Sequence, residues 1–385
     1  MKNSPYPILF LILLFACTDS HHATENTTIV DIDVNARKDY NFSYFFDTCY
    51  IVPLQTTDAA LIGDVSNVIL KEENIFILDN RKSKSIFIYD WKGQLKNVID
   101  NLGEGPGQYL SPSHMSIPEA DSLIYITDLL AQKRHSYTFD GAFKESVKLD
   151  PSTMYTDLMQ GNGLFYTTGG DNVEKTKFVN VYDSDFNLLK RMNISFKDDI
   201  WIQGVRKSKY FYEKADGKGV LYKGLRTNSI ITIDNDSITQ VMRVNLSSDS
   251  FHYDPNTPIQ AVELSKRVRQ SEKYMVGDGV LDSHRHLFVD IIKGGDVLMA
   301  VYHKDTGEAH LVGKLINDIN GVVVSLTGIL SDSNTPNYFI MALFPAQFRD
   351  VMKYKKIQSP YDPILDAIQL DDADNPILFI YRFRQ

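Results

Sequence analysis

A repeated unit of short β-strands constrains the fold of this 385-residue chain more than any other feature of its sequence. In successive copies, Asp79 and Asp128 end matching apolar runs that lie 49 residues apart. Asp90 and Asp140 end the next runs, 50 residues apart, and Asp183 ends the corresponding run 43 residues beyond Asp140. The runs alternate apolar and polar residues and are separated by polar turns, which is the pattern of antiparallel hairpins. The sequence therefore predicts an all-β protein built from repeats.

A repeat of 43 to 50 residues with four strands in each unit is typical of a β-propeller blade. A lone unit leaves a sheet face and two edges exposed, so it needs neighbours of the same kind. Six units require about 300 residues, and insertions predicted to be helical at Ile259–Gln270 and Ala346–Lys356 use the surplus. We predict a six-bladed β-propeller of four-stranded antiparallel blades, with short helical insertions, over residues 28–385. The alternative, a β-sandwich array, would not explain the single repeat length.

Two strand-like runs, Thr27–Val34 and Phe45–Leu54, precede the first unit. One of them is expected to join the last blade and close the ring, because closure removes exposed sheet edges. The first unit is expected to begin with a strand at Leu61–Leu70. The fourth unit is irregular, and the strands expected from there onward are Lys209–Tyr212, Gly219–Tyr222, Ser229–Ile233, Ile238–Leu246, His286–Ile292, Val297–His303, Ala309–Val312, Tyr338–Phe344 and Pro376–Phe383.

The N-terminus has the pattern of an export signal. Lys2 is followed by the apolar run Ile8–Phe15, which is too short to span a bilayer. The run ends at Ala16-Cys17 and resembles a bacterial lipobox, which implies that Cys17 is lipidated and becomes the mature N-terminus. We therefore predict a lipoprotein signal peptide at residues 1–16 and a polar tether at residues 17–27. The alternative is an ordinary secretory signal in which Cys17 has no role.

Composition limits the partners and the thiol chemistry. Lys and Arg number 40 against 49 Asp and Glu, and no long run carries one sign of charge. Because nucleic-acid binding needs a basic face, no nucleic-acid partner is expected. With Cys17 lipidated, Cys49 is the only thiol left, so no disulfide is expected within the mature chain. Cys49 lies in an apolar run and is predicted to be a small buried residue. A nucleophilic role for Cys49 is not favoured, because the sequence places no His or Asn to support it.

Few motifs suggest chemistry. The glycine-rich run Gly103–Gly107 lacks the Lys-Ser/Thr of a phosphate-binding loop and is followed by Pro112, so it is predicted to connect two blades. His284 and His286 would share one face of a strand and could form half of a metal site, but no third ligand is visible. Surface or blade-edge histidines are the favoured interpretation.

Two acidic clusters resemble fragments of calcium loops, namely Asp183 with Asp185, and Asp234 with Asn235 and Asp236. Both lack the full spacing and the terminal Glu, so turn residues are favoured over ligands. No catalytic motif is visible, and we predict no catalytic residue and no metal ligand. A calcium ion in the central channel stays open as an alternative, because scattered ligands of that kind cannot be found from spacing.

Several segments of the sequence resemble those of the six-bladed β-propeller lipoproteins of Bacteroidetes, an NHL-like family whose biochemical activity is largely undefined. The resemblance extends over nearly the whole mature chain and includes the lipobox. Gln108 departs from it, since the family often has an acid there. The segments that carry the resemblance are Ile51–Thr57 with Leu61-Ile62-Gly63, Ile75–Asp79, Gly103–Tyr109 and Asp374–Arg382.

Together these features predict a lipid-anchored protein of the bacterial cell envelope, facing the periplasm or the cell surface. We expect a non-catalytic binding or scaffold module whose partners are the membrane, through its lipid, and a protein, peptide or glycan. The alternative is a metal-dependent hydrolase or lyase, similar to the lactonases, with its site in the central channel.

Overall fold

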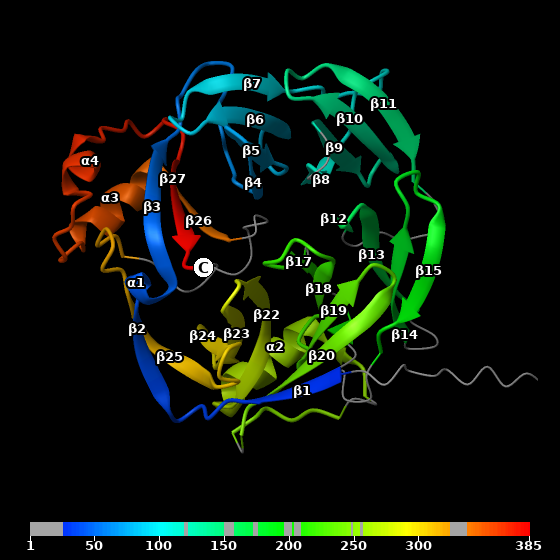
Figure 1. Cartoon of the computed structure of the whole chain (residues 1–385), viewed down its shortest axis with the longest axis vertical. Helices are drawn as coiled ribbons and strands as arrows, with labels where there is room; N and C mark the ends of the chain where they lie inside the picture. The colour runs from blue at the N-terminus through cyan, green and yellow to red at the C-terminus, as the bar shows by residue number, and fades with distance from the viewer. Residues whose placement is uncertain are drawn as a thin grey trace, which may run out of the picture.

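Six antiparallel sheets are arranged as blades around a central axis (Figure 1). This computed structural model describes residues 26–118, 122–149, 158–171, 176–195, 202–203, 209–247, 249–254, 257–323 and 337–385. The predicted all-β, six-bladed propeller is confirmed. The signal peptide, Cys17 and almost all of the tether lie outside the described residues. The first strand begins at Asn26 and so takes in the last two residues of the predicted tether.

Each blade runs from an inner to an outer strand. In blades 1 to 3 the order is sequential: β4 (Asn67–Lys71), β5 (Asn74–Asp79), β6 (Ser85–Asp90) and β7 (Leu95–Ile99); β8 (Pro112–Ser116), β9 (Leu123–Asp128), β10 (Lys133–Thr138) and β11 (Phe143–Lys148); β12 (Leu158–Gly161), β13 (Leu164–Asp171), β14 (Thr176–Tyr182) and β15 (Leu188–Asn193).

Blades 4 to 6 follow the same plan. Blade 4 holds β17 (Phe211–Glu213), β18 (Val220–Lys223), β19 (Ser229–Asp234) and β20 (Ser237–Asn245); blade 5 holds β22 (Tyr274–Asp282), β23 (His286–Lys293), β24 (Asp296–His303) and β25 (Ala309–Ile316); the described strands of blade 6 are β26 (Tyr338–Leu343), β27 (Ile377–Phe383) and β3 (Phe46–Pro53). A separate pair joins β16 (Ile202–Gln203) to β21 (Ile259–Gln260).

The core lies between neighbouring blades. All six residues of β5 are buried, because both faces of this strand pack against other blades. Phe76 and Leu78 face blade 2, whereas Ile75 and Ile77 face blade 6, as the period-two alternation of a strand requires. Local pattern located most strands, but it placed the first strand too early, at Leu61–Leu70, and it missed the inner strands β8, β12 and β22.

The N-terminal segment, residues 26–53, runs around the outside of blades 4, 5 and 6, and we call it the belt (Figure 1). Its first strand, β1 (Asn26–Asp31), adds parallel to β20, and its second, β2 (Arg37–Asn41), adds parallel to β25. Its third, β3, pairs antiparallel with β27 and closes the ring. Of the two predicted candidates for closure, Phe45–Leu54 is confirmed. Thr27–Val34 instead covers the edge of blade 4.

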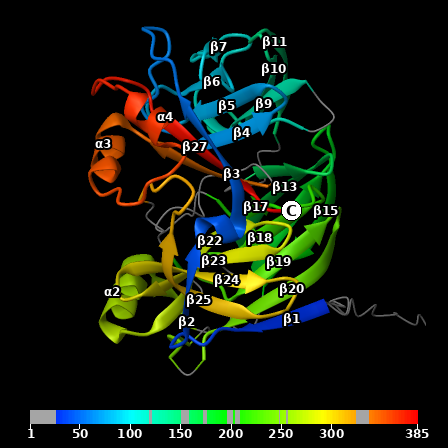
Figure 2. The same cartoon turned by 60° about the vertical axis from the view of Figure 1, so that its left-hand side comes forward.

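Helices α2 (Ala261–Ser271), α3 (Pro345–Lys353) and α4 (Asp362–Ala367) lie on one side of the molecule (Figure 2). Two of them match the predicted insertions. Pro345 stands at the start of α3, where its fixed φ suits a first turn, and the Gln347 side chain accepts from the Phe344 N–H at 3.0 Å. The short α1 (Phe42–Phe45) joins β2 to β3. No helix within the described residues is long and apolar enough to cross a membrane.

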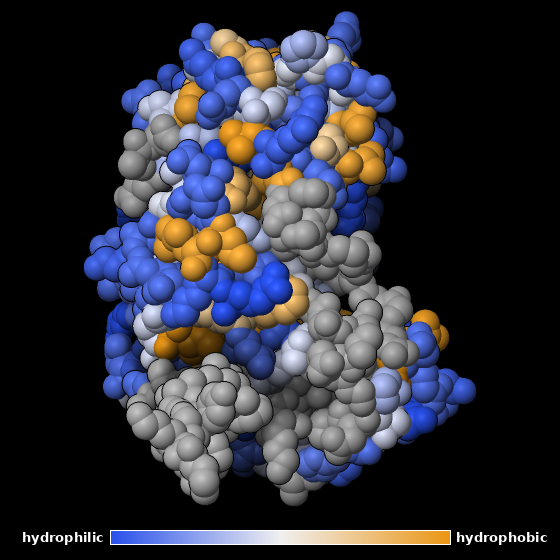
Figure 3. Space-filling view, turned by 90° about the vertical axis from the view of Figure 1, so that its right-hand side faces the viewer, coloured by the Kyte–Doolittle hydropathy of each residue, from blue (hydrophilic) through white to orange (hydrophobic). Residues whose placement is uncertain are grey.

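Blades 1, 2 and 3 end at β7, β11 and β15, beyond which no further strand lies within the described residues. Figure 3 shows the side of the molecule that carries β11 and β15, where hydrophobic residues form small groups among hydrophilic ones. Lys144, Glu145 and Lys148 give β11 a charged edge, which discourages pairing with another chain.

Candidate functional site

Three half-buried aromatic side chains meet where blade 6 closes against blade 1, and we call them the aromatic rim: Tyr50, Trp91 and Tyr338. Tyr50 comes from β3, Tyr338 from the start of β26, and Trp91 from the turn between β6 and β7. Strand alternation turns Tyr50 toward blade 1, while its neighbour Cys49 packs between blades 5 and 6. The rim therefore exists only once the ring has closed.

The Trp91 ring is the centre of this cluster. Its centroid lies 5.3 Å from that of Tyr50, with the planes at 65°, and 6.4 Å from that of Tyr338. Its indole N–H donates to the Glu72 carbonyl at 3.2 Å, which fixes the ring against the β4–β5 turn of its own blade. Aromatic rings that pack edge to face are rigid and keep part of their surface exposed.

An ion pair stands beside the rings. Arg382 donates through Nε to Asp47 Oδ1 at 2.8 Å and through Nη2 to Thr48 Oγ1 at 3.1 Å. The side chains of Arg382 and Asp47 are 42% and 33% exposed, so the pair contributes little to stability.

The protonation states of these groups follow from their surroundings. Burial acts to raise the pKa of Asp47, but the hydrogen bonds from Arg382 and Thr48 outweigh it and hold the pKa below its ordinary value. Burial raises the pKa of Tyr338, and the nearby Tyr50 adds to this effect. At neutral pH the rim and the ion pair beside it therefore offer a carboxylate, a guanidinium and the neutral phenol of Tyr338.

This combination fits a flat ligand that has both an apolar face and hydroxyl groups. Aromatic faces pack against apolar C–H surfaces, and planar carboxylate and guanidinium groups bond neighbouring hydroxyls. A few polar groups beside an apolar platform are usual in small-molecule sites.

The glycine-rich run connects β7 to β8, as predicted. Gly103 and Gly107 have positive φ of 152° and 71°, and the Gly105 N–H donates to Gln108 Oε1 at 2.8 Å. The Tyr137 hydroxyl donates to the Gly107 carbonyl at 2.8 Å. The loop's groups thus bond to the chain itself. The Gln108 side chain supplies one of those bonds.

The two predicted histidines do not form a pair. His284 is exposed in the turn before β23, whereas His286 begins the strand and is only 6% exposed. The structure instead places His303, from the neighbouring strand β24, with its ring 5.0 Å from that of His286. The hairpin turn at Gly294–Gly295 sets this register, since Lys293 opposes Asp296 and His286 opposes His303. Counting back from that turn would have found the partner.

Both acidic clusters occupy turns. Asp183 Oδ1 accepts from the backbone N–H groups of Asp185 and Asn187 at 2.9 and 2.8 Å, which is an Asx-type turn. Asp234 accepts from Lys214 at 2.6 Å, and Asp236 lies 3.7 Å from Lys190. Their oxygens therefore bond turn N–H groups, lysines and nearby side-chain amide or hydroxyl groups.

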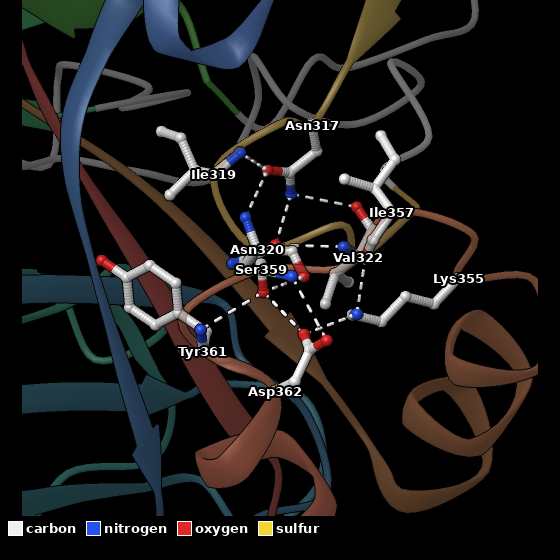
Figure 4. A network of polar contacts seen from close by, with 9 residues as sticks. All are labelled: Asn317, Ile319, Asn320, Val322, Lys355, Ile357, Ser359, Tyr361 and Asp362. Carbon is white, nitrogen blue, oxygen red and sulfur yellow. Dashed lines mark hydrogen bonds and ion pairs between the residues drawn. The ribbon is translucent and has the colours of Figure 1, made fainter.

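Cys49 is buried, and burial raises its pKa to about 12, so its thiol is inert at neutral pH. It belongs to a polar network that joins the loop after β25 to the α3–α4 connection. Asn320 donates to Cys49 Sγ at 3.2 Å, and the Ser359 hydroxyl bonds both the Asn320 carbonyl and Asp362. Figure 4 shows this connection, in which Lys355 donates to Asp362 at 2.6 Å. The network is structural: it holds the helical insertion against the ring.

Each described inner strand carries a polar residue: Lys71, His114, Gln160, Glu213 and Asp278. Burial raises the pKa of Glu213 to about 8, against the opposing effect of Lys209. Within the described residues, no three His, Cys, Asp or Glu side chains lie close enough together to hold a metal ion. The channel-calcium alternative thus finds no cluster of three carboxylates in this part of the chain.

The comparisons with known proteins concern the fold and the family. A crystal structure from Bacteroides fragilis, described as that of an exported protein, matches with a TM-score of 0.68 and 18% identity, covering 93% of this chain and all of that one. A DUF4221 family member from Bacteroides vulgatus matches with a TM-score of 0.48 and 9% identity, covering 88% and 97% of the two chains. A streptogramin B lyase matches with a TM-score of 0.45 and 10% identity, covering 87% and 98%.

No functionally curated protein matches the sequence. The predicted resemblance to a six-bladed propeller family of Bacteroidetes is confirmed by a family match over most of the chain, and the Bacteroides fragilis structure has a similar fold. Residues 27–382, nearly the whole described chain, match a domain of unknown function, and the chain accordingly belongs to the DUF4934 family.

Proposed function

We propose that this chain is a lipid-anchored binding protein of the cell envelope whose aromatic rim holds a glycan. The observation that carries the proposal is the half-buried Trp91 ring between Tyr50 and Tyr338, with the Asp47–Arg382 pair alongside. A sugar ring presents an apolar C–H face and equatorial hydroxyls, which these aromatic and planar charged groups complement. Of the three ligand classes expected from the sequence, a glycan fits this chemistry best.

The binding test uses the mature chain and a panel of bacterial and host oligosaccharides, with calorimetry on every glycan that is retained. Trp91→Ala should weaken binding about tenfold, equivalent to ~1.4 kcal/mol, because one aromatic platform is lost. Tyr354→Ala is the matched control, since Tyr354 is 68% exposed in the connection between α3 and α4 and should not alter affinity. Full affinity in both Trp91→Ala and Tyr338→Ala would overturn the assignment of the rim.

The same titrations test the enzyme alternative. A glycan that only binds should be recovered unchanged after long incubation with the protein. Cleavage or elimination of a retained ligand would replace the binding function with a hydrolase or lyase.

The anchor supports the envelope assignment and has a separate test. The apolar run that ends at Cys17, and the exported relative from Bacteroides fragilis, both favour an extracytoplasmic location. A lipoprotein cysteine carries more than one acyl chain, which gives lasting attachment. Cys17→Ala should release the protein from membranes on fractionation, and continued retention would refute lipidation.

A further inference from the structure

Where the belt crosses from blade 5 to blade 6, its aromatic side chains cover two buried histidines. The Tyr40 hydroxyl lies 2.9 Å from His303 Nε2, and the Phe45 ring packs edge-on against His286 at 5.1 Å. His286 and His303 are 6% and 7% exposed, and their ring centroids lie 5.0 Å apart. His310 extends the row from β25, 5.7 Å from His303.

The surroundings of these imidazoles disfavour added protons. Burial, His303 and Arg285 lower the pKa of His286 to about 4, with Asp305 opposing. Burial also lowers the pKa of His303, as do His310 and Lys38. The titratable and charged groups that face the pair are Lys38, Tyr40 and Tyr44 on the belt, and Arg285, Lys304, Asp305, Glu308 and His310 on blade 5.

Other contacts hold the same crossing but do not involve a histidine. Ser43 bonds Asp318 through its backbone N–H at 2.9 Å, and the Arg384 backbone N–H donates to the Phe45 carbonyl at 2.8 Å. Tyr40 itself stays protonated, because burial raises its pKa to about 12. The two imidazoles are therefore the buried histidines directly beneath the aromatic cover, and their charge depends on pH in mild acid.

We propose that mild acid releases the belt crossing at residues 37–46 from blade 5, because His286 and His303 gain protons much more readily when the aromatic cover over them opens. Two cations 5 Å apart in a buried site repel each other, and the open form hydrates both. The release is local, since the four hairpin strands of blade 5 do not depend on the crossing for their pairing.

The direction with pH follows from the pKa values. A histidine whose pKa falls on burial stabilises the closed form fully above its unfolded value near 6.5. That stability is lost as the pH falls from about 6.5 to about 4, where His286 becomes protonated even when closed. One linked proton changes the opening equilibrium about tenfold for each pH unit in this window, and two linked protons change it more.

Hydrogen exchange on the mature chain between pH 7.5 and 4.5 tests this, with rates corrected for intrinsic exchange. Protection of residues 37–46 should fall at least tenfold, whereas β5 and β6 of blade 1 keep theirs. His303→Gln should make the profile less steep, because one of the two linked protons is lost while His286 remains. His284→Gln is the matched control and should behave as the wild type, since His284 is exposed two residues from His286.

A second variant keeps the test decisive if His303→Gln does not fold. Tyr40→Phe removes the hydroxyl over His303 but keeps the ring, so it should lower protection of the crossing already at pH 7.5 and leave the pH dependence in place. Unchanged protection of residues 37–46 at pH 4.5, or equal loss in blade 1, would overturn the proposal.

Discussion

The two halves of the ring protect their sheet edges in different ways. Blades 4 and 5 each carry a fifth, parallel strand from the belt, and blade 6 takes its outer strand from the same segment. Blades 1, 2 and 3 end at β7, β11 and β15 without a covering strand in the described residues. The belted half is thus stabilised by long-range pairing, and the bare half depends on local hairpins and on the side chains of its edges.

This difference predicts how far the effect of a packing defect should spread through the ring. The belt contributes Val30, Ile32 and Val34 to the core between blades 4 and 5. It also contributes Tyr40, Phe42, Phe45 and Phe46 to the core between blades 5 and 6. A defect in the belt should therefore be felt across three blades, whereas a defect on a bare edge should stay within one.

The largest effect is expected from Phe42→Ala. Phe42 is fully buried in the belt, with its ring 5.1 Å from those of Phe46 and Tyr381. Removing such a ring from a core costs about 3–5 kcal/mol of the free energy of unfolding, which urea denaturation would measure. Phe143→Ala on the bare edge strand β11 is the control: Phe143 is 37% exposed, and its loss should cost less than about 1 kcal/mol. Equal costs would remove the distinction between the halves.

The repeated hairpins could be predicted well from the sequence, because residues that are close together in the chain determine each hairpin. The aspartates that end the second strands illustrate this, since Asp79 and Asp128 both bond the loop that enters their own blade. The belt was only partly predictable. Its strand β1 pairs Thr28 with Met242, and no local pattern specifies a partner more than 200 residues away.

Strand β2 was missed for a related reason. Four of its five residues are exposed and only Tyr40 is buried, so it lacks the alternation that identifies a strand. The aromatic rim was missed because ring closure brings together Tyr50, Trp91 and Tyr338 from three distant parts of the sequence. Each of these residues lies in a segment whose sequence has the pattern of an ordinary strand or turn.

An intermediate effect is expected from Asp79→Asn in the bare half. The Asp79 carboxylate is buried and accepts from the backbone N–H groups of five residues: Gly63, Asp64, Arg81, Lys82 and Ser83. Amide substitution should cost about 1–3 kcal/mol at pH 7, measured by urea denaturation. Asp185→Asn, in an exposed turn, is the control and should change stability by less than about 0.5 kcal/mol.

The two halves should also lose stability at different pH values, and Asp79 sets the value for blade 1. Burial acts to raise its pKa, but the bonds from Lys82, Ser83, Gly63 and Asp64 outweigh this and lower it. Its stabilisation is therefore complete above the unfolded pKa of about 3.9 and is lost as the pH falls below that value. The belt crossing should loosen at milder acid, between about 6.5 and 4. Hydrogen exchange that reported blade 1 opening first would reverse this order.

The smallest effect is expected from Leu189→Lys on β15. Leu189 is 54% exposed on an outer strand that no described strand covers, so the substitution should change the free energy of unfolding by no more than about 0.5 kcal/mol. A lysine on an apolar edge also discourages pairing between chains. Sedimentation at rising concentration should therefore show equal or less self-association than the wild type. A cost above about 1 kcal/mol would mean that the outer side of blade 3 is packed, as blades 4 and 5 are by the belt.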